Sequence, residues 1–217
     1  MSRAQGIYKR YPSYIVGCII AVVLVSLGIV WSVRPIVGSV GENASSFDLE
    51  GEGPIQVDDI PEGVVLTREQ FERIEFPIQR TEQEWRALLE EKQYQVLRQR
   101  ETERAYSGKY DRRFREGTYH SAATGQPLFS SAAKYESHTG WPSYFEPIDP
   151  RAVLYVEDHS LILRQIEIVD SKSGSHLGHV FDDGPEPSGR RYCMNSAALV
   201  FVPEGEHPPQ PDESPAD

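Results

Sequence analysis

The sequence predicts a mainly β protein of the α+β class: a small antiparallel β-barrel or two packed sheets with N-terminal helices, preceded by one transmembrane helix. Three observations predict it. Residues 15–33 form an uncharged apolar run of nineteen positions, a helical pattern begins at Thr81, and from Gly117 onward short β-type segments alternate with turn residues. A chain of 217 residues, 39% of them hydrophobic, is long enough for one sizeable domain with such additions.

As a helix, the uncharged run would be about 28 Å long, which matches the hydrocarbon thickness of a bilayer. Arg3, Lys9 and Arg10 precede it without any acidic residue among them, so the positive-inside rule places residues 1–14 in the cytoplasm. A cleaved signal peptide is the alternative, although its apolar core usually has only about 7 to 15 residues. We therefore expect a single-pass inner-membrane protein whose C-terminal domain is periplasmic or otherwise extracytoplasmic.

Residues 34–79 are expected to be an acidic linker, and residues 204–217 a disordered acidic tail rich in proline. Residues 35–63 contain no Lys or Arg, and their acids are Glu42, Asp48, Glu50, Glu52, Asp58, Asp59 and Glu62. Composition of this kind is typical of solvated segments. Much of the net charge of −11 lies there, and an acidic chain is not expected to bind nucleic acid.

The helical pattern opens with Thr81-x-x-Glu84, which has the form of a capping box. Apolar residues follow at helical spacing, and they are Trp85, Leu88, Leu89, Tyr94 and Leu97. We expect these helices to pack on the domain that follows.

Five β-strands are predicted between clusters of Gly, Pro, Asp and Ser. They cover residues 127–131, 152–157, 161–169, 176–181 and 190–202. The last segment is apolar on both faces, which indicates a strand buried on both sides, as in a small barrel or between two sheets.

The predicted chemistry centres on Cys193, the only cysteine outside the apolar run, where Cys18 lies. Arg191, Cys193 and Asn195 alternate, so on a strand their side chains share one face. The turn at residues 182–185 returns the chain toward His176 and His179. A lone cysteine in an apolar strand is often only a small buried hydrophobe, but cations and imidazoles nearby are what activate a thiol.

The chain resembles the methionine-R-sulfoxide reductases of the B type (MsrB, or SelR domain), over about residues 80–203. The resemblance rests on six motifs in family order. They are RAYSG at 104–108, GTY at 117–119, PLFSS at 127–131, GWPS at 140–143, HLGHVF at 176–181 and RYCMNS at 191–196.

This resemblance implies reduction of methionine-R-sulfoxide, with Cys193 as the nucleophile and a sulfenic acid as its product. It makes His179 or His176 the acid toward the departing oxygen, with His179 in the more direct role. Three residues apart on a regular strand, the two histidines would face opposite sides, so both serve only if Gly178 permits a bulge.

The remaining expected site residues have supporting roles. Arg191 would help to activate the thiol, Asp183 would orient an imidazole or a water near it, and Asn195 would hold the water or oxygen. The alternative for Asn195 is a strand amide that pairs with the backbone. Trp141 would form the apolar wall for the substrate methyl group.

The sequence also departs from the resembled family. Many members bind a structural zinc through two Cys-x-x-Cys pairs, whose positions here are Ser121, Thr124, Asp170 and Ser173. We therefore expect no metal and no cofactor. A resolving cysteine is missing too, so an external thiol or a thioredoxin-like reductant would recycle the enzyme.

Two other functions fit part of the pattern. A catalytically inactive, membrane-tethered domain could bind oxidised methionine or a partner protein without turnover. A metal-dependent enzyme could use His176, His179 and Asp183 as ligands, but this leaves Cys193 and Trp141 without a role.

Overall fold

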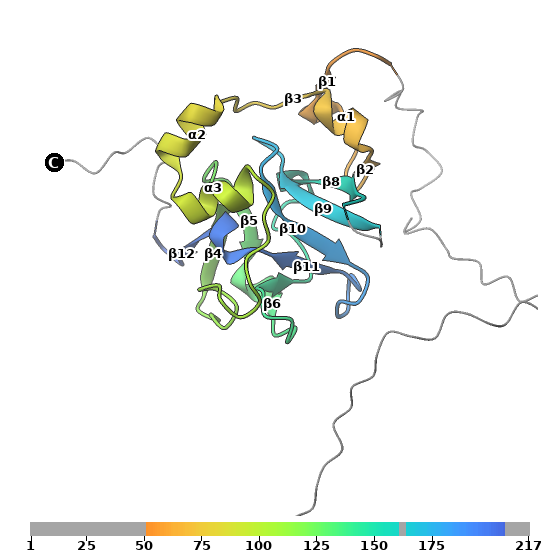
Figure 1. The fold of residues 1–217 in the computed structure, drawn as a ribbon. Helices are drawn as coiled ribbons and strands as arrows, with labels where there is room; N and C mark the ends of the chain where they lie inside the picture. The colour runs from red at the N-terminus through yellow and green to blue at the C-terminus, as the bar shows by residue number, and fades with distance from the viewer. Residues whose placement is uncertain (1–50, 161–163, 207–217) are drawn as a thin grey trace, which may run out of the picture. The chain divides into compact units, whose positions relative to one another are not determined.

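The computed structural model describes residues 51–160 and 164–206, in which β-strands predominate (Figure 1). The strands form a seven-stranded sheet, a three-stranded sheet and a two-stranded pair. The prediction of a mainly β protein with a few helices is thus confirmed.

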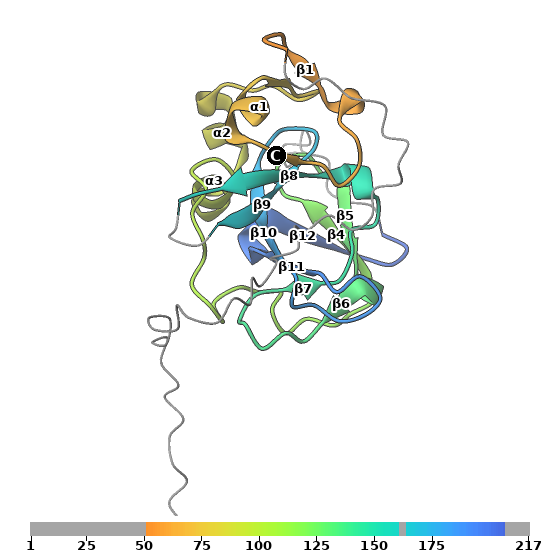
Figure 2. The same ribbon diagram turned by 90° about the vertical axis from the view of Figure 1, so that its right-hand side faces the viewer.

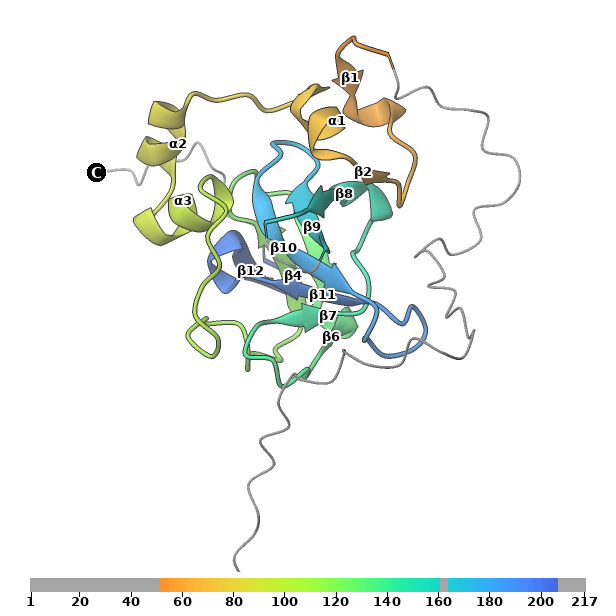
Figure 3. The ribbon, with the colours of Figure 1, turned by 45° about the vertical axis from the view of Figure 1, so that its right-hand side comes forward.

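The seven-stranded sheet has the order β2-β8-β9-β10-β11-β7-β6, and Figure 3 shows β8 to β6 following one another. Neighbouring strands are antiparallel except β2 and β8, which are parallel. Its members are β2 (Val65–Leu66), β6 (Lys134–Tyr135), β7 (Ser143–Tyr144), β8 (Val153–Asp158), β9 (Gln165–Asp170), β10 (His176–Phe181) and β11 (Arg191–Met194).

The three-stranded sheet contains β12 (Leu199–Pro203), β4 (Gly117–Ser121) and β5 (Pro127–Ser130), all antiparallel (Figure 2). Aromatic side chains pack it against the larger sheet. Phe129 stacks on Tyr144 with ring centroids 4.4 Å apart, and Tyr119 meets Tyr144 edge-on at 5.2 Å. The two sheets are packed on each other but not closed into a barrel, so the second of the two expected arrangements is the one found.

The strand predicted at residues 190–202 is in fact two strands in different sheets. The chain leaves β11, turns through the 3-10 helix η4 (Ser196–Ala198) and enters β12, where Leu199 pairs with Ser121 of β4. Each half is apolar because it lies near the interface between the sheets, and this produced the pattern of one long buried strand. The strand at 176–181 has the predicted bounds, whereas the short strands β4, β6 and β7 were not predicted.

Two short helices precede the β portion, α2 (Glu82–Leu88) and α3 (Glu91–Leu97). The predicted capping box is present: the Thr81 hydroxyl accepts a hydrogen bond from the Glu84 backbone N–H, and the Glu84 carboxylate accepts one from the Thr81 N–H. Trp85 and Leu97 are almost fully buried. Figure 1 shows both helices on one side of the sheets, so the expected packing on the domain is confirmed.

The segment expected to be a linker is folded where the structure describes it, from residue 51 to 79. It forms β1 (Ile55–Gln56), η1 (Val57–Asp59), β2, α1 (Arg68–Glu72) and β3 (Ile74–Glu75). Ile55, Ile60, Leu66 and Ile74 are buried in a small core with side chains of β8 and β9. The sequence predicted a linker because these apolar residues are few among many acidic and polar ones. Their burial is nevertheless enough to attach the segment to the sheet.

The expected cytoplasmic end, the apolar run at 15–33 and the linker up to residue 50 lie outside the described residues, as does the tail from residue 207. Within the described residues, no helix combines the length and apolar character needed to span a bilayer.

Candidate active site

Strands β10 and β11 pair so that His179 lies directly opposite Cys193. The chain reverses between them, as the sequence predicted. Side chains opposite each other in an antiparallel pair point to the same face. The imidazole and the thiol therefore share one face of the seven-stranded sheet.

A β-bulge between His176 and Gly178 brings the second histidine to that face. The pairing of β10 with β9 shifts register there, and the two imidazole rings are 5.4 Å apart. Gly178 also allows the close approach of β11, because a Cβ at this position would lie 2.2 Å from the carbonyl oxygen of Cys193. Gly178 therefore permits the bulge that was required for both histidines to face the same side of the sheet.

The shared face forms the floor of a cleft of about 580 Å³. Five of the seven predicted site residues line it: Trp141, His176, His179, Cys193 and Asn195. Phe181 and Arg100 complete much of the wall. A cleft with apolar aromatic walls and a few polar groups is the usual form of a small-molecule or side-chain site.

Cys193 is a free, partly buried thiol. Its Sγ lies 3.9 Å from the Thr139 hydroxyl. Burial raises the pKa of Cys193, while the charge of Arg191 and hydrogen bonds from its neighbours act in the opposite direction. The effect of burial is the larger, so the pKa of the thiol lies above its ordinary value.

Arg191 is held by Asp183. Its Nε and Nη2 donate to the two carboxylate oxygens at 2.8 and 2.9 Å, and its guanidinium lies 4.3 Å from the centre of the Phe181 ring. Asp183 therefore pairs with the cation instead of orienting an imidazole, contrary to the expectation. Sequence spacing does not distinguish an imidazole from Arg191 as the partner, because His176, His179 and Arg191 all lie within eight residues of Asp183.

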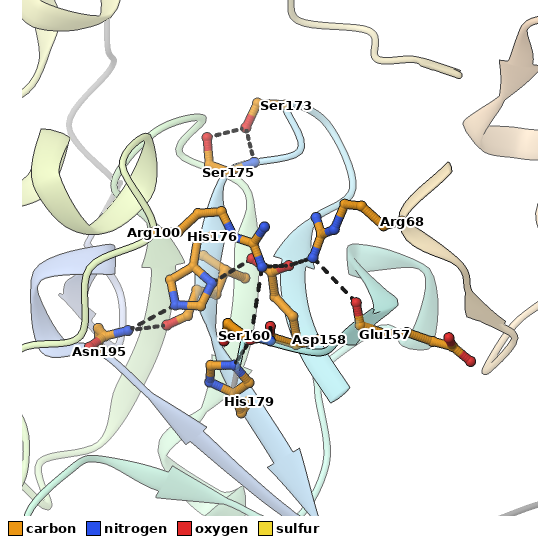
Figure 4. A network of polar contacts seen from close by, with 12 residues as sticks. Arg68, Arg100, Glu157, Asp158, Ser160, Ser173, Ser175, His176, His179 and Asn195 are labelled. Carbon is orange, nitrogen blue, oxygen red and sulfur yellow. Dashed lines mark hydrogen bonds and ion pairs between the residues drawn. The ribbon is translucent and has the colours of Figure 1, made fainter. Parts of the chain in front are cut away.

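The imidazoles are oriented by two other carboxylates that the sequence did not indicate. His179 Nε2 donates to Asp158 Oδ2 at 2.8 Å, and His176 Nδ1 donates to Glu167 Oε1 at 2.7 Å (Figure 4). Burial acts to raise the pKa of each carboxyl, but the combined hydrogen bonds and charges around it hold that pKa below its ordinary value. His179 and Ser160 act on Asp158, and His176, Arg68 and Arg100 act on Glu167. Burial lowers the pKa of His179 despite Asp158.

Asn195 is buried, and its amide is used largely by the backbone. Its Oδ1 accepts from the Glu103 N–H at 3.0 Å, and its Nδ2 donates to the Leu177 carbonyl at 3.1 Å. The same Nδ2 lies 3.5 Å from His176 Nε2. This is the alternative considered for Asn195, a backbone-paired amide, although the side chain also borders the cleft.

Glu103 joins three parts of the site and was missed by the sequence reasoning. Its carbonyl accepts from the Trp141 indole N–H at 3.0 Å. Its buried carboxylate accepts from the N–H groups of Ser196 and Ala197 at 2.6 and 3.1 Å. Glu103 follows a charged stretch, so only its contacts some 90 residues along the chain reveal this role.

Comparison with known proteins identifies the family. Residues 89–203, more than half of the chain, match the SelR domain. The chain belongs to the SelR domain family. It is 50% identical over 127 residues to the peptide methionine sulfoxide reductase MsrB of Methanosarcina mazei, covering 58% of this chain and 91% of that protein.

Two further MsrB proteins show the same extent of similarity. The one from Methylibium petroleiphilum is 48% identical over 126 residues, 58% of this chain and 91% of that protein. The one from Pseudomonas savastanoi pv. phaseolicola is 47% identical over 126 residues, 58% of this chain and 96% of that protein. The resemblance inferred from the motifs is thereby confirmed.

The positions that resemble the zinc ligands of many family members converge in space, but their chemistry is different. Asp170 is fully buried and accepts from Thr124 Oγ1 at 2.7 Å, Gln126 Nε2 at 2.7 Å and the Lys172 N–H at 2.8 Å. Burial raises the pKa of Asp170, against the hydrogen bonds of Ser121 and Thr124. One carboxylate and three hydroxyls, with no thiolate or imidazole, do not fit a structural zinc.

Proposed function

We propose that this chain reduces methionine-R-sulfoxide to methionine through thiol chemistry at Cys193. Family membership and the MsrB relatives make it a peptide-methionine (R)-S-oxide reductase. The observation that carries the proposed mechanism is the pairing of Cys193 with His179 on the floor of the aromatic-walled cleft.

The reaction needs a nucleophile, an acid and a place for the substrate methyl group. Cys193 sulfur attacks the sulfoxide sulfur, the sulfur–oxygen bond of the substrate breaks, and the oxygen ends on the cysteine. The products are methionine and a sulfenic acid at Cys193, so the substrate sulfur gains the two electrons that the cysteine loses.

Proton movement follows from the resting charges. The thiol is protonated because its pKa is raised, and His179 is neutral because its pKa is lowered. The proton lost by Cys193 therefore suffices for the substrate oxygen, with His179 as its carrier. His176, whose Nδ1–H is held by Glu167, presents its other ring nitrogen beside Asn195.

Selection of one epimer follows from a cleft that is polar on one side and apolar on the other. The substrate oxygen would lie toward the two histidines, and the methyl group against Trp141 and Phe181. A sulfoxide of the opposite configuration would exchange these groups and leave its oxygen against an aromatic ring.

Recycling requires an external reductant, because the chain has only one cysteine besides Cys193, and that is Cys18 in the apolar run. Two equivalents of a small thiol, or one thioredoxin-like dithiol, would reduce the sulfenic acid to the thiol and water. The substrate would be methionine sulfoxide in oxidised proteins.

The test uses full-length protein, the separated R and S epimers of a methionine sulfoxide substrate, and dithiothreitol. Cys193→Ser should abolish reduction of the R epimer, since a serine hydroxyl does not ionise near neutral pH. Without reductant, one equivalent of substrate should leave a sulfenic acid that dimedone traps at residue 193. His179→Ala should slow turnover about 100-fold while leaving Cys193 reactive toward iodoacetamide.

Activity retained by Cys193→Ser, or a residue 193 unmodified by dimedone after treatment with substrate, would refute the mechanism. If the domain only binds oxidised methionine, both the wild-type protein and Cys193→Ser should bind the substrate, and neither should reduce it. That outcome would favour the inactive, tethered domain over the enzyme.

We further propose that the domain works outside the cytoplasm, tethered by the apolar run at residues 15–33. The basic flank before this run and the absence of Lys and Arg between Arg34 and Arg68 support that orientation. Protease added to intact spheroplasts should remove the domain from the membrane. If the domain is protected from the protease, the proposed orientation is wrong. A mature N-terminus beyond Ser32 would show that the apolar run is a cleaved signal peptide and not an anchor.

A further inference from the structure

A buried carboxylate behind His176 is shared with two arginines. Glu167 is 1% exposed, and its Oε1 accepts from His176 Nδ1 at 2.7 Å. Its Oε2 accepts from Arg68 Nη2 at 2.6 Å and lies 2.8 Å from Arg100 Nη2. Figure 4 shows the side chains of Arg68, Arg100 and His176 converging.

The two arginines come from different places in the chain. Arg100 lies within the region that matches the SelR domain and lines the cleft. Arg68 is the first residue of α1, ahead of that region, and is not among the residues that line the cleft. The contact of Arg68 that leads toward the cleft is the one with Glu167.

Local structure fixes Arg68 firmly. Thr67 caps α1 with a reciprocal capping box, and β2 directly before it pairs in parallel with β8, Val65 opposite Tyr155. The Arg68 Nη2 also lies 3.4 Å from the Glu157 carbonyl of β8. The folded segment 51–79 thus delivers one guanidinium to a defined point behind the cleft.

We propose that the segment 51–79 is a positioning element for the reductase site, in which Arg68 holds Glu167 and, through it, the imidazole of His176. A carboxylate buried to this degree stays ionised only if its charge is compensated. An ionised Glu167 accepts from Nδ1–H, which fixes the ring plane and leaves Nε2 directed toward Asn195. Loss of Arg68 leaves Arg100 as the sole cation on Glu167, and Arg100 must also serve the cleft and Asp158.

This inference rests on the proposed function, in which the substrate oxygen lies toward both His176 and His179. The groups that face His176 are Glu167 from β9, His179 from its own strand and the Asn195 amide. Arg68 and Arg100 act on it through Glu167, and Asp158 acts through His179.

The test compares three variants of the full-length protein. Arg68→Ala should lower kcat about fivefold, the effect of losing part of one charge-assisted hydrogen bond, with KM for the R epimer changed less than about twofold. Arg68→Lys keeps the charge and should recover part of kcat. Arg151→Ala is the matched control, because it breaks an ion pair with Glu62 that also holds segment 51–79 to the domain but involves neither Glu167 nor His176.

A spectroscopic readout separates positioning from general stability. The Nδ1–H proton of His176, bound to a carboxylate, should give a downfield resonance in the ¹H NMR spectrum. Arg68→Ala should shift or broaden it, whereas Arg151→Ala should leave it in place. If the alanine variant does not fold, Arg68→Lys replaces it in the comparison; it should still lower kcat and shift the resonance relative to Arg151→Ala, because a single ammonium does not reproduce the guanidinium contacts with Glu167 and Glu157.

Equal kcat in Arg68→Ala and wild type, or equal losses in Arg68→Ala and Arg151→Ala, would overturn the inference. His176→Ala distinguishes this failure from failure of the proposed mechanism. If that variant loses activity while Arg68→Ala does not, the mechanism stands and the positioning role falls. If His176→Ala is fully active, the reaction does not need His176, and a role of Arg68 in positioning this imidazole is excluded as well.

Discussion

At Cys193, burial and charge act in opposite directions. Removal from water raises the pKa of the thiol, and the guanidinium of Arg191 lowers it. Asp183 binds that guanidinium through two hydrogen bonds. The negative charge of Asp183 therefore offsets part of the stabilisation that Arg191 gives to the Cys193 thiolate. The ion pair of Arg191 and Asp183 therefore sets how readily the thiolate forms.

This arrangement predicts opposite effects for two substitutions. Arg191→Ala removes the cation and should raise the pKa of Cys193, so that alkylation by iodoacetamide at pH 8 slows about threefold. Asp183→Asn removes the anion and should lower the pKa, so that alkylation at pH 8 becomes faster. In each protein the rate should rise with pH through the pKa of the thiol, because the thiolate is the reacting form.

The measurement is the pH dependence of alkylation at residue 193, resolved from Cys18 by peptide mass spectrometry. Shifts of the pH midpoint in the same direction for both variants would contradict the prediction. Arg112→Ala, an exposed arginine whose carboxylate neighbour Asp111 is 3.9 Å away, controls for loss of positive charge alone.

At the residue scale, local spacing predicted part of the site, but it did not predict that Asp183 pairs with Arg191. Alternation placed Cys193 and Asn195 beside one cleft, and the turn after Phe181 brought His179 opposite the thiol. The carboxylates Asp158, Glu167 and Glu103 could not be predicted in the same way. Their partners in the site lie 9 to 99 residues away along the chain, and only the packing of strands brings them together.

At the scale of elements, strand β10 depends on Gly178. This glycine sits at the bulge that turns both histidines to one face, and a Cβ there would meet the Cys193 carbonyl oxygen at 2.2 Å and the Met194 Cα at 2.9 Å. Both are backbone atoms of β11, which cannot move without breaking the ladder that holds Cys193. The absence of a side chain at residue 178 is therefore a condition for the site.

Gly178→Ala should lower the free energy of unfolding by about 2–4 kcal/mol, because the strands must separate to admit the methyl group. Activity should fall by more than the change in folded fraction explains, since His179 and Cys193 would lose their register. The checks are chemical denaturation and the rate of reduction of the R epimer. Gly53→Ala, with no atom near the added methyl, should match wild type; the same result for Gly178→Ala would refute the argument.

Elements with strong local signals were predicted well. The capping box at Thr81 and Glu84 and the strand at 176–181 have the expected form. The long strand at 190–202 was wrong in one respect, because apolar periodicity does not record where a strand passes from one sheet to another. At the passage from β11 to β12, the Glu103 carboxylate accepts hydrogen bonds from the first two backbone N–H groups of η4.

At the scale of the whole molecule, hydrogen bonds join side chains that are distant in sequence, at the positions that resemble the family's zinc ligands. The turn after β4 supplies Thr124 and Gln126, β9 ends at Asp170, and the turn after it supplies Lys172. The hydrogen bonds of Thr124 and Gln126 to Asp170 thus join the three-stranded sheet to the seven-stranded sheet. Replacement of the cysteines was predicted from the sequence, but the network that joins the turns was not, because Gln126 lies outside the resembled ligand positions.

The domain should therefore hold its fold without a metal. Excess EDTA should leave the free energy of unfolding unchanged, whereas a domain that depends on structural zinc would unfold with chelator. Asp170→Ala should lower the free energy of unfolding by about 3 kcal/mol, because three donors around the buried carboxylate lose their acceptor at once. Asp149→Ala, at an exposed carboxylate that accepts only the Arg151 N–H, serves as the matched control and should change stability by about 1 kcal/mol or less. Elemental analysis that finds about one zinc per chain, or loss of the folded state in EDTA, would show that a metal still joins these turns and that the hydrogen bonds of Asp170 do not suffice.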